Sequence, residues 1–248
     1  MIIAANWKAY VESEAKAKAL AAAARRLAAK ESRTIVLAPP APYLGLLAGG
    51  KGKKDIALAA QDISDSTGGA ATGEITAALL ADLGITYAII GHSERRAMGE
   101  TDELVASKVQ HALAHSITPI VCIGERERDA EATYLHFLRA QIARVFEPLS
   151  QKDRMRIVLA YEPIWAIGKS AVDSIQPNDL QEMVLYIQKV LGVYLPGKAT
   201  GAVPILYGGS VEAGNIRLLA QDSGVSGFLI GHASADVSSF RALVKALD

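Results

Sequence analysis

The segment Ile157-Val158-Leu159-Ala160-Tyr161-Glu162-Pro163-Ile164-Trp165-Ala166-Ile167-Gly168 decides how the rest of the chain is interpreted. Its first five residues are apolar or aromatic without alternation, which is the pattern of a parallel strand buried on both faces. Glu162 places a carboxylate at the end of this strand, and Pro163 stops the strand because its ring fixes φ. The residues from Trp165 to Gly168 have the composition of a loop that can fold over a ligand and exclude water. The segment predicts a buried strand that delivers a candidate base to a lid, although a structural ion pair of Glu162 is equally compatible with it.

Short apolar runs alternate with helical patterns along the whole chain. The expected strands are Ile2–Ala5, Thr34–Ala38, Ile56–Ala60, Tyr87–Ile90, Pro119–Ile123, Ile157–Tyr161, Pro204–Tyr207 and Gly227–Ile230. The expected helices are Ser13–Lys30, Tyr43–Leu47, Glu74–Leu83, Asp102–His115, Asp129–Phe146, Pro177–Leu191, Ala213–Ala220 and Val237–Leu247. Successive strands are roughly thirty residues apart, which is the length of a βα unit with a crossover helix.

Eight βα units in 248 residues predict an α/β fold, a single-domain (β/α)8 barrel, in preference to an open doubly wound sheet. No Pro/Ser-rich linker and no change of composition indicates a second domain. In such a barrel the ligand lies at the carboxyl ends of the strands. The polar residues expected at this rim are Asn6, Lys8, Gln61, His92, Glu94, Glu125, Glu162 and the turn Gly208-Gly209-Ser210.

Composition restricts the partners of the protein. Half of the residues are hydrophobic and 21% are charged, which is typical of a globular protein rather than a disordered one. Lys plus Arg and Asp plus Glu each number 26, so the zero net charge gives no support to nucleic acid or a membrane surface as a partner. Cys122 is the only cysteine, which excludes an intrachain disulfide and favours a cytoplasmic location. The apolar patch at Ile2 and Ile3 is too short for a signal-peptide core, and no apolar run is long enough to cross a bilayer.

Two basic residues follow expected strands closely enough to reach a ligand. Lys8 comes just after the first strand, where a fixed cation would neutralise an anionic substrate and oppose negative charge developing on oxygen. His92 follows Gly91 at the end of the fourth strand, and Ser93 is expected to cap the helical turn after it. An imidazole near a helix N-terminus can stay neutral and donate a hydrogen bond as an electrophile. The alternatives are a mobile surface lysine and a core histidine.

Two glycine turns indicate a phosphate site. Leu206-Tyr207-Gly208-Gly209-Ser210-Val211 ends the seventh expected strand, and Ile230-Gly231-His232-Ala233 ends the eighth and precedes an expected helical turn. Glycines expose backbone N–H groups, and the loops after strands seven and eight of barrel enzymes frequently bind phosphate. Neither turn matches a Walker loop or a dinucleotide-binding fingerprint.

Three further features point more weakly to function. His111 and His115 have the i, i+4 spacing of a metal pair, but no third ligand is placed near them, so a solvated helix face is favoured and no metal is expected. Lys51-Gly52-Lys53-Lys54 is interpreted as a solvated loop rather than a nucleic-acid contact. Cys122 lies in an apolar strand, which favours a core residue over a nucleophile.

Taken together, these residues make the chain similar to the triosephosphate isomerase family from Ala5 to nearly the last helix. The matching signatures occur in the family's order: Ala5-Asn6-Trp7-Lys8, Gly91-His92-Ser93-Glu94-Arg95-Arg96, Tyr161-Glu162-Pro163-Ile164-Trp165-Ala166-Ile167-Gly168 and Tyr207-Gly208-Gly209-Ser210-Val211. The resemblance implies a TIM barrel that interconverts dihydroxyacetone phosphate and D-glyceraldehyde 3-phosphate through an enediolate, without any cofactor, in glycolysis and gluconeogenesis.

The resemblance also implies roles for individual residues. Lys8 would be the cationic electrostatic residue, His92 the electrophile and proton shuttle, and Glu162 the base, a pairing that is well established for the family. Asn6 and Glu94 would support these three. The phosphate-binding positions would be Gly168, Ser210 and Gly231, together with His232, and the turn residues Tyr207 and Gly209 would support them.

Members of the family are usually homodimers in which the third loop enters the partner. The corresponding loop here is Gln61–Glu74, and Thr72 would reach the partner's site near Asn6 and Lys8. The chain departs from the family at three places. It lacks two residues, Thr-Gly, after Gly168, which shortens the lid; His232 replaces a glycine; and Ala71 stands where phenylalanine is common.

These departures leave two alternatives to triosephosphate isomerisation. The shorter lid and His232 would also suit the same proton transfer on a longer ketose phosphate, such as erythrulose phosphate. A catalytically silent barrel that binds a ligand or a partner is an alternative of a different class, since barrels host many functions. The presence of Lys8, His92 and Glu162 together argues against a silent barrel.

Overall fold

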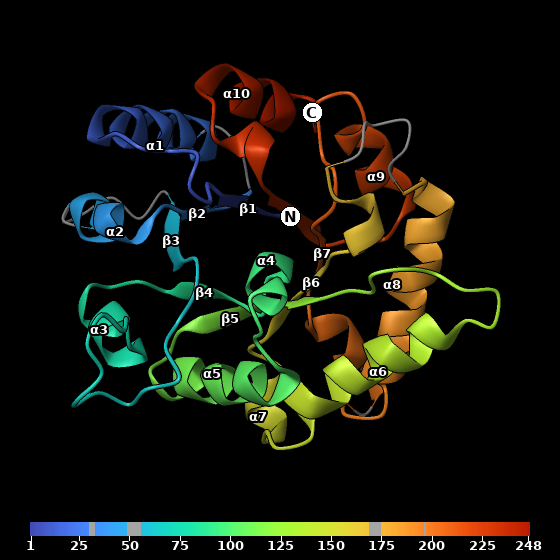
Figure 1. Cartoon of the computed structure of the whole chain (residues 1–248). Helices are drawn as coiled ribbons and strands as arrows, with labels where there is room; N and C mark the ends of the chain where they lie inside the picture. The colour runs from blue at the N-terminus through green and yellow to red at the C-terminus, as the bar shows by residue number, and fades with distance from the viewer. Residues whose placement is uncertain (30–32, 49–55, 169–174, 196) are drawn as a thin grey trace.

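The computed structural model describes residues 1–29, 33–48, 56–168, 175–195 and 197–248. Eight parallel strands close into one barrel in chain order, and helices surround it (Figure 1). The (β/α)8 architecture predicted from the sequence is therefore confirmed. The strands are β1 (Ile2–Asn6), β2 (Thr34–Ala38), β3 (Ala57–Ala60), β4 (Tyr87–Ile90), β5 (Thr118–Ile123), β6 (Val158–Tyr161), β7 (Ile205–Tyr207) and β8 (Gly227–Ile230).

Most of the helices lie outside the strands and cover their outer faces, whereas the short helix α4 lies over the middle of the barrel in this view (Figure 1). The inner faces of the strands pack on one another in the barrel interior. The helices are α1 (Glu14–Ala28), α2 (Ala41–Ala48), α3 (Ala77–Asp82), α4 (Ser93–Ala97), α5 (Asp102–Ala114), α6 (Thr133–Phe146), α7 (Gln151–Arg154), α8 (Pro177–Leu191), α9 (Ile216–Asp222) and α10 (Val237–Lys245). In the described parts of the chain there are also three short 3-10 helices, η1 (Ile164–Ala166), η2 (Gly197–Ala202) and η3 (His232–Ser234).

Alternation along the strands places the candidate base inside the barrel. On β6, Val158 and Ala160 belong to the apolar cluster of the barrel interior, whereas Leu159 and Tyr161 pack against the helices. Side chains of a strand alternate between its faces, so Glu162, two residues after Ala160, continues the inward set. Sequence and pleat together direct this carboxylate to the barrel mouth.

Several helices begin later than the sequence predicted, and the short helices α4 and α7 were not among those predicted. The prediction began α6 at Asp129, but the helix begins at Thr133 because Ala132 is left-handed (φ 56°) and Asp129 accepts the Thr133 N–H at 2.7 Å. The prediction began α9 at Ala213, but this helix begins at Ile216. The side chain of Asn215 accepts the Glu212 N–H at 2.9 Å, which holds the preceding residues in a turn.

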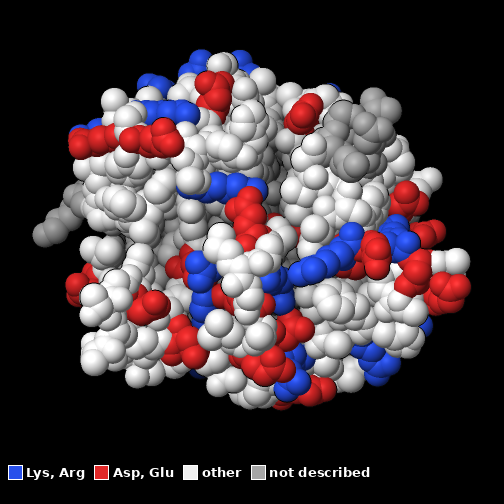
Figure 2. Space-filling view, viewed as in Figure 1, with Lys and Arg blue, Asp and Glu red and all other residues white. Residues whose placement is uncertain are grey.

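Charges of both signs are interspersed on the molecular face drawn in Figure 2, and no large patch of one sign stands out there. Below the surface, the buried Lys108 ammonium lies 2.8 Å from Asp62 and also pairs with Glu100. Within the described ranges, no helix is both long and apolar enough to cross a membrane.

Substitution of Gly124 by Ala is expected to destabilise the barrel by about 3 kcal/mol. A Cβ atom at this position would lie 1.8 Å from the backbone oxygen of Glu162, so a neighbouring strand end would have to move. The matched control is Gly45→Ala in α2, where no atom lies within 4 Å of the new methyl group. Removing a helical glycine there should add roughly 0.5–1 kcal/mol of stability. Urea unfolding measures both changes, and equal midpoints for the two variants would contradict the prediction.

Candidate active site

Lys8 is held in an unusual backbone conformation at the end of β1. Its φ is 45°, in the left-handed region that costs energy for a residue with a side chain. Two side chains hold this conformation: Asn6 Oδ1 accepts the Lys8 N–H at 3.0 Å, and Gln61 Nε2 donates to the Lys8 carbonyl at 2.9 Å. The ammonium lies 2.7 Å from Glu94 Oε1. A strained backbone therefore presents a cation at the barrel mouth, where the sequence predicted one.

A backbone hydrogen bond orients the His92 ring. Gly91 has φ 72°, and a Cβ atom there would lie 2.9 Å from Val105, so glycine is required for the turn that places His92. His92 Nδ1 accepts the Glu94 N–H at 3.2 Å, so the ring proton lies on Nε2. The prediction that Ser93 caps α4 is wrong, because His92 is the N-cap and Ser93 is the first helical residue. The ring thus presents an Nε2–H donor, as an electrophile requires.

Glu162 is almost fully buried at the cavity, with 3% of its surface exposed. Its Oε2 accepts the Ser93 N–H at 3.1 Å, and its Oε1 lies 3.3 Å from His92 Nε2. Gly208 makes room for it, since a Cβ atom at 208 would lie 2.7 Å from Glu162 Cγ. In the described parts of the chain, no Arg or Lys lies within ion-pair distance of this carboxylate, which contacts a histidine instead. The alternative of a structural ion pair with Arg or Lys is therefore not what the structure shows.

The two glycine turns lie on the same side of the site. A Cβ atom at Gly209 would lie 2.1 Å from the hydroxyl oxygen of Tyr207, so this glycine allows the turn to pass over the buried tyrosine ring. A Cβ atom at Gly231 would lie 3.3 Å from Lys8 Cε. The backbone of the second turn therefore runs against the lysine stem, which places exposed peptide groups beside a cation.

One cavity of about 350 Å³ unites these residues. Leu229 of β8, at 3% exposure, lies at the boundary between the cavity and the barrel interior. Many of the predicted site residues line this cavity. They are Asn6, Lys8, His92, Glu162, Gly168, Gly208, Gly209, Ser210, Gly231 and His232. Concave sites with a few convergent polar groups are the usual form of small-ligand sites.

A hydrogen-bonded cluster fixes the beginning of the lid. Glu125 Oε1 accepts from the Tyr161 hydroxyl and Trp165 Nε1, both at 2.8 Å, and from Arg128 Nε at 3.0 Å. The Arg128 guanidinium also lies over the Trp165 ring, 4.9 Å from its centroid. Burial raises the pKa of Tyr161, so its hydroxyl stays protonated. Ser210 Oγ further donates to the Ala166 carbonyl at 3.0 Å, which links the lid to the turn after β7.

Other predicted residues lie outside the cavity. Tyr207 packs in the core below it, and Thr72 is exposed on the loop before α3, so neither lines it. Burial, followed by the charge of Glu162, raises the pKa of the Cys122 thiol, which is buried in the barrel interior and unsuited to act as a nucleophile. His111 lies 3.6 Å from Asp65. The segment from Lys51 to Lys54, and the lid beyond Gly168, fall outside the described residues.

The sequence analysis missed Tyr10, which lines the cavity next to Lys8. Its ring meets that of His232 edge to face, with centroids 5.2 Å apart and an interplanar angle of 79°. A lone tyrosine in a polar loop carries no periodic signal. Its position two residues after Lys8, beyond a strand end, was the one available indication.

Comparison with known proteins gives a consistent result. A family model described as "Triosephosphate isomerase" matches residues 1–247. Proteins named triosephosphate isomerase from Symbiobacterium thermophilum and a Roseiflexus species are 38% and 39% identical, over 99% of this chain and 96% and 97% of their own lengths. A protein of the same name from Alkalilimnicola ehrlichii is 42% identical over 86% of this chain and 85% of its own.

Proposed function

Because the chain belongs to the triosephosphate isomerase family, we propose that it interconverts dihydroxyacetone phosphate and D-glyceraldehyde 3-phosphate, with Lys8, His92 and Glu162 as its catalytic residues. The observation that carries this assignment is their convergence on one cavity, with His92 Nε2 only 3.3 Å from Glu162 Oε1. The reaction needs no cofactor, since it moves only protons within the substrate.

Lys8 and the glycine turns bind the substrate in this proposal. The phosphate lies against the peptide groups of Gly168, Ser210 and Gly231, and the Lys8 ammonium is close enough to Gly231 to share its charge with this anion. The Asn6 side chain supports Lys8 by accepting its backbone N–H, and Glu94 orients the lysine side chain through the ion pair. The carbonyl oxygen is then placed between Lys8 and the His92 Nε2–H.

The proton transfer follows from these positions. The Glu162 carboxylate takes a proton from the carbon next to the carbonyl, and the electron pair of the broken C–H bond moves toward the carbonyl oxygen to give an enediolate. Lys8 and His92 Nε2–H stabilise the negative charge on this oxygen. His92 moves a proton between the two oxygens, and protonated Glu162 returns its proton to the neighbouring carbon. Before the first step, Glu162 leaves the Ser93 N–H that holds it here.

A second part of the proposal concerns the domain organisation, the location and the self-association of the protein. Residues 1–248 form one domain, and the protein acts in the cytoplasm in glycolysis and gluconeogenesis. Two copies associate through the loop Gln61–Glu74, in which Thr72 is exposed and free to reach a partner's Lys8 region. Leu79 and Leu83, 56% and 45% exposed near this loop, support such an interface.

A coupled assay tests the proposed activity directly. Purified protein should convert D-glyceraldehyde 3-phosphate to dihydroxyacetone phosphate with no metal and no nucleotide other than the cosubstrate of the coupling enzyme, and faster than it isomerises erythrulose 4-phosphate. A higher kcat/KM for the four-carbon substrate would favour the longer ketose phosphate, and folded protein without activity on either would favour a silent barrel. Light scattering at several concentrations measures the dimer independently.

A further inference from the structure

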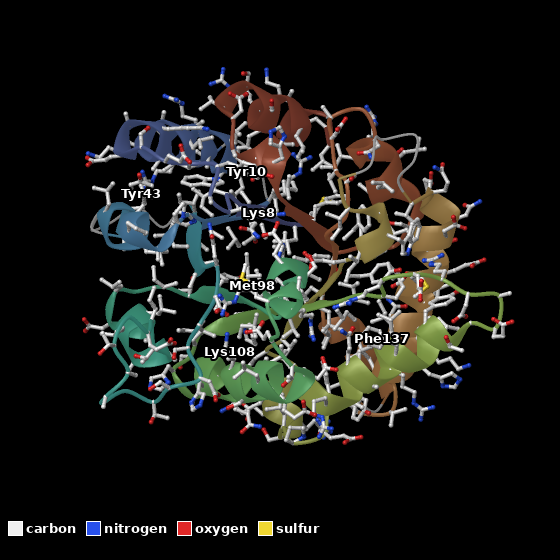
Figure 3. All side chains as sticks on the ribbon, viewed as in Figure 1. Lys8, Tyr10, Tyr43, Met98, Lys108 and Phe137 are labelled. Carbon is white, nitrogen blue, oxygen red and sulfur yellow. The ribbon has the colours of Figure 1, made fainter. Side chains whose placement is uncertain are left out.

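Two aromatic side chains at the cavity rim have no part in the proton transfer. Tyr10 belongs to the segment after β1, and His232 is the first residue of η3 after β8. The strands β1 and β8 pair in parallel, with Ala5 opposite Ile230, so both segments leave the barrel side by side. Figure 3 shows Tyr10 close to Lys8 in this part of the molecule.

The backbone of each residue is held in place. The Tyr10 N–H donates to the Trp7 carbonyl at 3.0 Å, and the Tyr10 carbonyl accepts from Lys16 Nζ at 3.0 Å. On the other side, the Ser234 hydroxyl donates to the Ile230 and Gly231 carbonyls at 2.9 and 2.7 Å, which fixes the turn that carries His232. The edge-to-face contact of the rings thus joins two fixed segments.

The pair lies next to the wall where the phosphate is bound in the proposed function. Gly231 precedes His232 and runs against Lys8, and the turn at Ser210 lines the same cavity. A neutral imidazole has one N–H donor and an imidazolium has two, so the ring can donate to a phosphate oxygen in either state. The Tyr10 ring meets the His232 ring edge to face at this rim, where both residues are exposed.

We propose that Tyr10 and His232 form a specificity-determining pair for the phosphate group of the substrate. His232 donates a ring N–H to the phosphate, and Tyr10 is a positioning residue that keeps this ring over the cavity. The inference rests on the proposed function and adds a side-chain donor to the peptide groups that bind the anion. This additional hydrogen bond makes the enzyme discriminate more strongly between phosphorylated and unphosphorylated three-carbon substrates.

The test compares His232→Ala with His136→Ala, a control on an exposed histidine of α6 outside the cavity. His232→Ala should raise the KM for D-glyceraldehyde 3-phosphate and the inhibition constant of inorganic phosphate roughly three- to tenfold, the effect of one hydrogen bond. Its kcat/KM for unphosphorylated D-glyceraldehyde should match that of the control. A merely structural role would impair both substrates equally.

The Tyr10 variants separate positioning from direct contact. Tyr10→Ala should raise the same constants by a smaller factor, whereas Tyr10→Phe, which keeps the ring, should behave as the wild type. The double variant Tyr10→Ala/His232→Ala should be no worse than His232→Ala alone, because Tyr10 acts through His232.

Three outcomes would contradict the proposed roles of Tyr10 and His232. They are an unchanged or lower inhibition constant in His232→Ala, an equal loss on both substrates, or additive effects in the double variant. Calorimetric titration with inorganic phosphate measures the same contact without turnover. Failure of the pair is therefore distinguishable from failure of the proposed isomerisation, which the wild-type assay decides.

Discussion

Replacement of Glu162 by Gln is expected to lower kcat by about 10³-fold, in the middle of the range for loss of a general base. The amide has nearly the shape of the carboxylate. Its oxygen can still accept the Ser93 N–H, which lies 3.1 Å from the native Glu162 Oε2, so the fold should be retained. What is lost is the ability to take a proton from carbon. Steady-state rates in both directions measure the effect, with thermal unfolding to show that the variant is folded.

A second substitution separates the position of the base from its chemistry. Glu162→Asp keeps the carboxylate but draws it back by one methylene, and a displacement of about 1 Å can cost 10²-fold in rate. Glu131→Gln is the matched control, since Glu131 is exposed and outside the cavity. Rates close to wild type in either Glu162 variant would exclude this carboxylate as the base.

The second large effect is expected for Lys8→Met, with kcat/KM reduced by about 10²- to 10³-fold, the usual loss for one group that stabilises an oxyanion. Met has a similar length and no charge. Both residues have a Cβ atom, so the left-handed backbone at position 8 costs a similar amount in each, and the comparison isolates the ammonium.

Lys18→Met is the control for this loss of charge, because Lys18 lies outside the cavity and forms an exposed ion pair with Glu14 on α1. Both substrate affinity and turnover should fall in Lys8→Met, since the ammonium lies beside the phosphate turns and the carbonyl position alike. A change confined to KM would mean that Lys8 binds the phosphate without stabilising the enediolate.

The barrel and the positions of the proposed catalytic residues could be predicted from the sequence, because strand ends are a local signal. Uniform apolar runs predicted the strands, and parallel strands in a closed barrel bring their carboxyl ends to one rim. Asn6, Lys8, His92 and Glu162 follow from that rule. The pairing of His92 with Glu162 does not, because their 3.3 Å contact joins residues that are far apart in the chain.

Contacts made by single side chains were beyond the reach of the sequence. Glu125 was expected at the rim, but nothing local indicated that it would accept three hydrogen bonds and hold Trp165. Side-chain caps of short helices were also missed, since the N-cap of α4 is His92 and not Ser93. Such choices depend on which groups meet in the folded chain, and periodicity does not encode them.

At position 8, the residue that suits the left-handed backbone best differs from the residue that the proposed activity needs. Glycine would adopt φ 45° without penalty, so a laboratory selection for heat resistance alone should favour it there. In the proposed function, the selected variants would resist heat better but would lose the ammonium, with the loss of about 10²- to 10³-fold in kcat/KM that is expected for Lys8→Met. In the proposed function, lysine at this position keeps its ammonium in the cavity at the cost of a strained torsion angle.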